Sequence, residues 1–250
     1  MPDFQIRLPG VGGVATGGGG ESDWTPSFSD HKGPILHHAQ LHLVFWGTAW
    51  ADAQAPSADD VTAAVQVILS STFTSALAQY RDIAAATVHG TSLATDSDPP
   101  DLFTDAQVTD FLKGMMQAGR LPEPDDATQL VYCVFMPRGV RHGDQSVIGE
   151  HSYFWYWDLE PPFDFDVGKA YYAWVTNDGT LDSMTTVFSH ELVEVVTDPE
   201  GSGITGSPCS ASGWCEIGDV CETSTGTVNG IAVQAYWSEQ ANACVVPGSA

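Results

Sequence analysis

The segment Leu181–Thr197 constrains this chain most, because it has the pattern of a core helix with charged residues in its middle. Apolar residues recur at helical intervals along it, and Asp182 or Ser183 is placed to cap its first turn. Three ionisable residues interrupt the apolar pattern, namely His190, Glu191 and Glu194. Because an unpartnered charge is costly to bury, these three residues are expected to meet an internal partner such as a cation.

The spacing of these residues suits metal chemistry. His190 and Glu194 lie one helical turn apart on one face, so both can contact one cation. Glu191 is then placed to act as general base on a water molecule whose pKa the metal has lowered. The pattern has the logic of the H-E-x-x-H metalloproteases, with Glu in place of the second His. The competing interpretation is a solvated helix face, which is common for H-E-x-x-E in an acidic chain.

Further carboxylates follow the helix. Pro199 disfavours the helical conformation at Asp198, which places Asp198 at the helix exit. A short stretch between two cysteines, Cys215 to Cys221, then presents Glu216 and Asp219. We therefore consider Asp198, Glu216 and Asp219 as additional metal ligands.

Charge narrows the classes of partner. The chain has 32 acidic and 8 basic residues, a net charge of −24, which disfavours nucleic acids and anionic membranes. The same charge would help to retain a divalent cation. The alternative is an acidic, solvated surface that only keeps the protein in solution. No apolar run approaches the length of a membrane span, and residues 1–10 lack the pattern of a secretory signal peptide.

The five cysteines bear on the compartment. Cys133 lies in an apolar run typical of a buried strand and is expected to be a free thiol. The other four lie near the C-terminus and can form two disulfides or, less favourably without a C-x2-C spacing, a four-thiolate zinc site: Cys209, Cys215, Cys221 and Cys244. Two disulfides favour an oxidising compartment, so we expect a secreted protein although no signal peptide is visible.

The whole chain predicts one α/β (α+β) domain with a mixed sheet. Residues 1–31, with a Gly-rich stretch at 10–20, are expected to be a flexible leader before a domain at 32–250. The remaining predicted elements are strands at 41–46, 129–136, 152–157, 170–175 and 231–237, a helix from 59 to about 80 with a break at 70–72, and a helix starting at Thr104 with a capping box.

Two motifs resemble a known family. The segment His190–Pro199, followed by Glu216–Cys221, is similar to the H-E-L-x-E-x-x-T-[DN]-P and E-I-x-D-x-C motifs of the phosphate-induced protein 1/EXORDIUM family and its bacterial relatives. The resemblance extends in order over roughly residues 33–245. It implies a zincin-like domain with His190, Glu194 and Glu216 as metal ligands.

The resemblance also implies roles for neighbouring residues. Asp219 would orient a ligand, and Asp198 would cap the helix end. His151 or Tyr153, on a predicted strand, would stabilise the oxyanion of the transition state. The alternative is that His151 is a hydrogen-bonded core histidine and that Tyr153 lies on an ordinary strand face. A second histidine cluster, His37, His38 and His42, is expected at the surface or a strand edge.

The leading hypothesis is a monomeric zinc metallopeptidase that acts on a peptide or protein substrate, with Glu191 as general base. A second hypothesis is a non-catalytic extracellular binding or signalling protein with a structural metal. A third is a disulfide-linked calcium module, which would use oxygen ligands rather than His190.

Overall fold

The computed structural model describes residues 26–52, 54–124, 129–157, 167–207 and 216–249, together with the backbone of residues 4–7. The helices are η1 (Thr48–Trp50), α1 (Ala58–Leu69), α2 (Thr72–Ser75), η2 (Ala76–Gln79), α3 (Asp105–Gln117), α4 (Leu181–Thr197) and η3 (Asp219–Cys221). The strands are β1 (Phe4–Arg7), β2 (Ser27–Asp30), β3 (Gln40–Trp46), β4 (Thr87–Ala94), β5 (Leu102–Phe103), β6 (Leu130–Phe135), β7 (Arg141–His142), β8 (Val147–Trp157), β9 (Val167–Val175), β10 (Ile204–Ser207), β11 (Thr225–Val228), β12 (Ile231–Gln234), β13 (Tyr236–Ser238) and β14 (Ala243–Val245).

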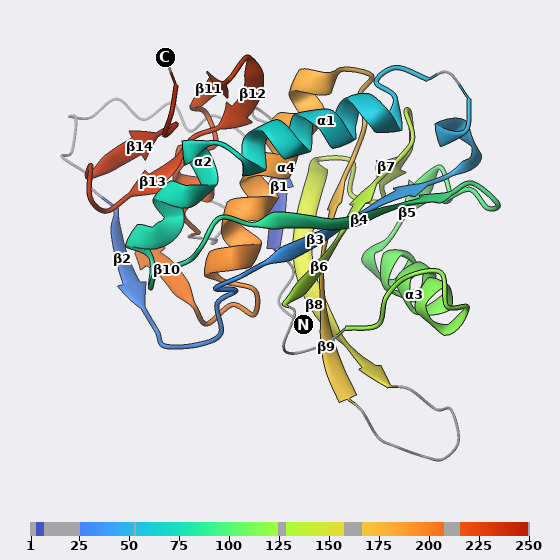
Figure 1. Cartoon of the computed structure of the whole chain (residues 1–250), viewed down its shortest axis with the longest axis horizontal. Coiled ribbons are helices and arrows are strands. Elements are labelled where there is room, and N and C mark those ends of the chain that lie inside the picture. The colour runs from blue at the N-terminus through green and yellow to red at the C-terminus, as the bar shows by residue number, and fades with distance from the viewer. Residues whose placement is uncertain are drawn as a thin grey trace.

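A mixed sheet forms the centre of the described structure (Figure 1). Its strand order is β1-β8-β9-β6-β3-β4, in which β9, β6, β3 and β4 are parallel. β8 pairs antiparallel with β9 on one side and with β1 on the other. The mixed α+β architecture predicted from the sequence is therefore confirmed.

Both faces of the sheet are covered. Alternate residues of β3 enter two separate apolar clusters, with Leu41, Leu43 and Phe45 on one face and Val44 and Trp46 on the other. Helices α1 and α4, with the C-terminal hairpins, cover the first face, and α3 covers the second (Figure 1). A parallel strand buried on both sides needs an almost continuous apolar sequence, which β3 and β6 both have.

Helix α4 has the predicted bounds but a different N-cap. The Thr180 hydroxyl, rather than Asp182 or Ser183, accepts a hydrogen bond from the Ser183 N–H at 3.3 Å. At the other end Asp198 is the C-cap, as Pro199 predicts, and its N–H donates to the Glu194 carbonyl at 2.7 Å. Every residue from 187 to 199 is buried. Around His190, Glu191 and Glu194 the helix is therefore enclosed by protein, whereas Asp182 in the first turn is exposed.

Several other predictions can be compared with the structure. The helix from residue 59 is interrupted as expected, forming α1, α2 and η2. The strand predicted at 231–237 is divided into β12 and β13, because Ala235 donates its N–H to Ser224 outside either ladder. Within the predicted leader, residues 4–7 form β1, which pairs with β8, and residues 27–30 form β2, which pairs with β10. The Gly-rich stretch lies outside the described residues.

Cysteine chemistry agrees in part with the sequence. Cys221 and Cys244 form a disulfide. Cys133 is a buried free thiol in β6, and burial, with a smaller effect of the Glu191 charge, raises its pKa to about 12. Cys209 and Cys215 lie outside the described residues.

No single described helix is long and apolar enough to cross a membrane, whereas the bent pair Ala58–Leu69 and Thr72–Gln79 meets the length and composition criteria together. Val61, Val65 and Ile68 of that pair are fully buried in the protein core.

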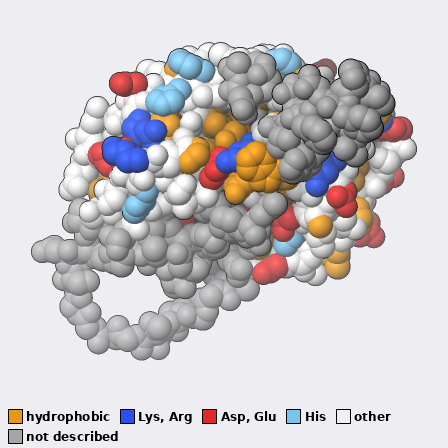
Figure 2. Space-filling view, turned by 90° about the horizontal axis from the view of Figure 1, so that it is seen from below, with side chains coloured by type: hydrophobic (Ala, Val, Ile, Leu, Met, Phe, Trp, Pro, Cys, Tyr) orange, Lys and Arg blue, Asp and Glu red, His pale blue; other side chains and the backbone are white. Residues whose placement is uncertain are grey.

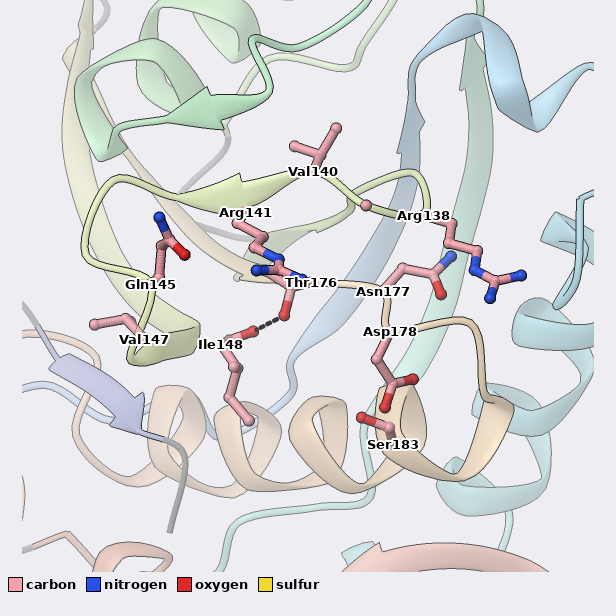
Figure 3. Close-up of a pocket in the computed structure, with 11 residues that line it drawn as sticks. Arg138, Val140, Arg141, Gln145, Val147, Ile148, Thr176, Asn177, Asp178 and Ser183 are labelled. Atoms are coloured by element: carbon pink, nitrogen blue, oxygen red, sulfur yellow. Dashed lines mark hydrogen bonds between the residues drawn. The ribbon is translucent and has the colours of Figure 1, made fainter. Parts of the chain in front are cut away.

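Acidic side chains are scattered over the face of the molecule shown in Figure 2, and most basic side chains on that face lie next to them. A pocket of about 460 Å³ lies beside the start of α4, between the loops that follow β6 and β9 (Figure 3).

Candidate metal centre

The polar residues of α4 meet side chains from two other parts of the chain. α4 packs against β8, β9 and β12. β8 contributes His151, the segment before η3 contributes Glu216, and η3 itself begins with Asp219. The structure thus brings together residues that are up to 68 positions apart in the sequence, from His151 to Asp219.

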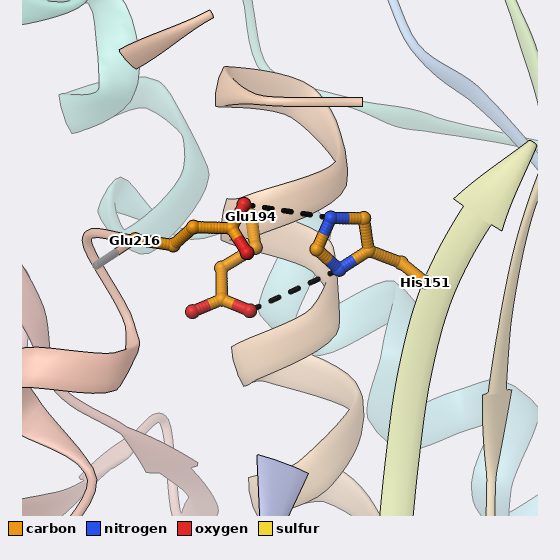
Figure 4. Close-up of side chains that lie close together, drawn as sticks. All are labelled: His151, Glu194 and Glu216. Atoms are coloured by element: carbon orange, nitrogen blue, oxygen red, sulfur yellow. Dashed lines mark ion pairs between the residues drawn. The ribbon is translucent and has the colours of Figure 1, made fainter. Parts of the chain in front are cut away.

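His151 lies between three carboxylates, those of Glu191, Glu194 and Glu216. Figure 4 shows the two from Glu194 and Glu216. The Nδ1 of His151 is 3.1 Å from Glu191 Oε2 and 3.8 Å from Glu194 Oε2. Its Nε2 is 3.5 Å from Glu216 Oε1. His151 was predicted either as a transition-state donor or as a hydrogen-bonded core histidine, and it is fully buried at the centre of the cluster.

His190 lies on the other side of Glu194. Its Nε2 is 3.0 Å from Glu194 Oε2, one helical turn away, and 3.9 Å from Asp219 Oδ1. Asp219 is held in place by two hydrogen bonds: its N–H donates to Glu194 Oε1 and its Oδ2 accepts from the Glu216 N–H, both at 3.0 Å. The expected alignment of His190 and Glu194 on one face is therefore present.

Two groups of residues have the geometry to hold a metal ion. One is His151, Glu194 and Glu216, and the other is His190, Glu194 and Asp219; in each, the potential ligand atoms lie within 4.8 Å of one another. Glu194 belongs to both. Glu216, implied by the resemblance as the third ligand beside His190, is grouped with His151 instead.

The cluster has more acidic than basic groups. Four carboxyl groups surround two imidazoles; they belong to Glu191, Glu194, Glu216 and Asp219. Apart from Asp219, each residue of the cluster has at most 2% of its surface exposed. With His190 neutral, as a metal ligand must be, and His151 protonated, four ionised carboxylates leave an excess of three negative charges. A divalent cation would reduce that excess to one, which supports the metal interpretation.

The pKa shifts show the same imbalance. Burial raises the pKa of Glu216 well above its usual range, and the Glu194 charge adds to the shift. Burial also raises the pKa of Glu191, and that of Asp219 to about 7. Burial alone would lower the pKa of His190, but Glu194 raises it to about 10. Without a cation, the cluster therefore retains protons to limit its negative charge.

Three buried atoms of the cluster make no contact of hydrogen-bond geometry among the described residues: His190 Nε2, Glu191 Oε1 and Glu216 Oε1. Two of them have only an ion-pair neighbour, with Glu194 Oε2 at 3.0 Å from His190 Nε2 and His151 Nε2 at 3.5 Å from Glu216 Oε1. Buried polar atoms in native proteins nearly always have a partner. One imidazole nitrogen and two carboxylate oxygens without a hydrogen bond are the kinds of atom that bind transition-metal ions in proteins.

The other predicted site residues lie apart from both groups. Asp198 Oδ1 accepts a hydrogen bond from the Gly203 N–H at 2.6 Å, so Asp198 organises the turn after α4. Tyr153 shares the His151 face of β8 by alternation, but its ring contacts Tyr171 and Lys169.

The histidine cluster near β3 differs from expectation at one residue. His42, predicted at the surface or a strand edge, is only 7% exposed on β3, which lies between β4 and β6. His42 shares its strand face with the apolar residues Val44 and Trp46, which was the signal that it faces the interior.

Sequence reasoning missed the residues that support His190. Gln234 of β12 places its Nε2 2.7 Å from His190 Nδ1 and 3.0 Å from the Gly218 carbonyl. A Cβ on Gly218 would lie 2.6 Å from Glu194 Oε1, so only glycine allows this loop to approach α4 so closely. Gly218 lies inside the quoted motif, whereas nothing in the sequence singles out Gln234.

Comparison with known proteins identifies no relative: no family profile, no curated protein and no solved structure matches the chain significantly.

Proposed function

We propose that this protein is a zinc-dependent metallohydrolase that cleaves peptide bonds. The observation that carries the proposal is the buried convergence of His190, Glu194 and Asp219 on one potential metal position, with Glu191 beside it on the same helix. The resemblance to the EXORDIUM family supports the same reading, and the disulfide Cys221–Cys244 is compatible with a secreted protein.

We assign His190, Glu194 and Asp219 as the metal ligands. This choice leaves Glu191 and His151 available for chemistry, whereas the other group would use His151 as a ligand. An imidazole in the ligand set favours zinc, because calcium takes six to eight oxygen ligands. When bound, zinc supplies Lewis acidity, which polarises a carbonyl group and lowers the pKa of water.

Glu191 is the proposed general base. Its Oε2 contacts His151 Nδ1 at 3.1 Å, while its buried Oε1 has no hydrogen-bond partner among the described residues and is available to take a proton. Burial raises its pKa, and a carboxylate with a raised pKa is a stronger base. His151 orients Glu191 and, as an imidazolium, stabilises negative charge that develops nearby.

Gln234 sets the tautomer of His190. A metal ion on Nε2 requires the proton on Nδ1, which needs an acceptor. As placed, the Gln234 Nε2 lies 2.7 Å from Nδ1 and donates to the Gly218 carbonyl at 3.0 Å. Gln234 would support the metal-bound form of His190 after a half-turn of its amide, which presents Oε1 to Nδ1 and gives up the hydrogen bond to Gly218.

The test is the conservative variant Glu191→Gln, assayed for peptide hydrolysis with a mixed fluorogenic peptide library. We expect turnover to fall by about 10²–10⁴-fold, because a general base typically contributes that factor. Bound zinc, measured by elemental mass spectrometry, should be unchanged because Glu191 is not an assigned ligand. Unchanged turnover in Glu191→Gln would contradict the proposed role.

Burial of the cluster favours a second candidate, a non-catalytic extracellular binding or signalling protein with a structural metal. His151, His190, Glu191, Glu194 and Glu216 are each at most 2% exposed, whereas a hydrolase must admit a substrate carbonyl group. Under this alternative, removing the metal lowers the melting temperature, and no peptide in the library is cleaved.

A further inference from the structure

The pocket beside the start of α4 is separate from the metal centre. It lies where the loops after β6 and β9 meet, and these two strands are neighbouring and parallel. Ligands of α/β proteins commonly bind outside the carboxyl ends of parallel strands. A volume of about 460 Å³ is enough for a small organic molecule. None of the residues of either metal group lines it.

Two arginines line this pocket, Arg138 and Arg141 (Figure 3). Neither makes an ion pair with a carboxylate among the described residues, although acidic residues outnumber basic ones by 32 to 8. Most other described basic residues do have such partners: Lys32 and Arg81 with Asp30, Arg120 with Asp96, and Lys169 with Glu200. Two unpaired guanidinium groups in one concavity are therefore unusual in this chain.

A buried amide adds a third donor. Asn177 lines the pocket and is only 3% exposed. Its Oδ1 accepts a hydrogen bond from the Gly179 N–H at 2.8 Å, whereas its Nδ2 is buried without a hydrogen-bond partner among the described residues. Because an unpartnered buried donor costs free energy, this N–H group requires an acceptor that a ligand can supply.

Arg138 packs closely against the loop that follows β9. A Cβ on Gly179, which has φ +99°, would lie 2.7 Å from Arg138 Nε, so the absence of a side chain lets Arg138 lie against the loop. The pocket's one acidic lining residue, Asp178, accepts hydrogen bonds from the Thr180 N–H and hydroxyl at 2.9 and 2.8 Å. Asp178 is thus engaged in the turn that precedes α4.

The remaining walls define the body of the ligand. Ile148 is partly exposed next to the donors, whereas Val140 and Val147 line the pocket from the buried apolar cluster behind it. The volume of the pocket, about 460 Å³, limits the ligand to a small molecule. We propose that this pocket binds a small organic anion, whose carboxylate or phosphate group is held by Arg138, Arg141 and Asn177.

Calorimetric titration of the full chain with phenyl phosphate and with benzoate tests the proposal, and benzyl alcohol serves as the uncharged probe. We expect one saturable site per chain for at least one of the two anions. The tighter anion identifies the head group as phosphate or carboxylate. Benzyl alcohol should bind much more weakly, because it makes no charge-assisted hydrogen bond.

Variants locate the site. Arg138→Gln and Arg141→Gln should each weaken binding about 10-fold or more, since each removes a charged donor. Asn177→Asp keeps an oxygen that accepts from the Gly179 N–H but replaces the Nδ2 donor with a negatively charged oxygen. It should also weaken binding about 10-fold or more. Arg120→Gln removes the same charge at an exposed pair and should leave the affinity within about 2-fold.

Three results would overturn the proposal. The first is dissociation constants above roughly 1 mM for both anions, which correspond to no meaningful recognition. The second is equal affinity for benzyl alcohol. The third is an equal loss of affinity in Arg120→Gln and in the two pocket arginine variants. Arg138 and Arg141 are exposed, so their replacement is not expected to unfold the protein.

Discussion

Two buried histidines in this protein respond to burial in opposite ways. His42 lies on β3, where it contacts Ser92 and His89, and burial, with the His89 charge, lowers its pKa to about 4. His190 lies on α4 beside Glu194, and there the carboxylates overcome the effect of burial and raise its pKa to about 10.

The difference shows what each region requires. The surroundings of His42 accept a neutral ring, and its Nε2 lies 2.9 Å from the Ser92 hydroxyl. The surroundings of His190 contain more carboxyl groups than imidazoles, so they require positive charge. Protons supply that charge in the metal-free cluster, and a divalent cation would supply it in the metal-bound form.

The largest expected effect follows from removal of the shared carboxylate. Glu194→Ala should weaken zinc binding by roughly 100-fold or more, because loss of a ligand exceeds the 10–100-fold typical of an indirect partner. Asp110→Ala removes an exposed carboxylate from α3 and serves as the matched control. Competition with a zinc-binding dye measures both affinities. Equal affinities in the two variants would contradict a site at Glu194.

The two metal groups can then be separated. Asp219→Asn should weaken zinc binding more than Glu216→Gln if the ion lies beside His190, because Asp219 is grouped with His190. The reverse order would place the ion beside His151.

Stability should differ between the two histidines. In the metal-free protein near pH 8, His190→Ala should cost about 3–5 kcal/mol, because Glu194 is left as a buried charge without its partner. His42→Gln should cost only about 1 kcal/mol, because it exchanges one neutral polar group for another. Urea unfolding measures both values. Similar losses would mean that the charge of His190 is unimportant.

A smaller effect is expected at Gln234. Gln234→Leu should weaken zinc binding about 10–100-fold by removing the partner of His190 Nδ1. The metal-free stability provides a second readout, since a purely structural role for Gln234 would lower stability without changing zinc affinity.

The smallest effects concern pH. His42 has a lowered pKa, so its contribution to stability is complete above pH 6.5 and is lost as pH falls through about 4. His190 has a raised pKa, so its contribution is complete below 6.5 and is lost as pH rises through about 10. The His42→Gln variant should therefore reduce only the acidic slope of metal-free stability, measured by unfolding between pH 4 and 10. A reduced alkaline slope would be inconsistent with these assignments.

Local patterns in the sequence were enough for the elements that place the site. The apolar periodicity of α4, the Pro199 stop and the spacing of His190 and Glu194 predicted a buried helix with two residues on one face. These features depend on residues within a few turns of one another. The same is true of α3, where Thr104 donates its N–H to Gln107 Oε1 at 2.9 Å, as a capping box requires.

Contacts between distant segments could not be predicted in this way. Whether Glu216 lies beside His151 or His190 depends on how the loop before η3 crosses α4, and Gly218 decides that approach. The position of Gln234 depends on how β12 packs against α4. The arginine pocket combines two loops that lie about 40 residues apart and meet only because β6 and β9 are neighbours.

The most direct test of the central claim is the metal content of the protein. Purification without chelators, zinc add-back and elemental mass spectrometry should give about one zinc ion per chain, with nearly all of it lost in the His190→Ala/Glu194→Ala variant. No bound transition metal in the wild-type protein after add-back, or equal amounts in both proteins, would contradict a metal centre on α4.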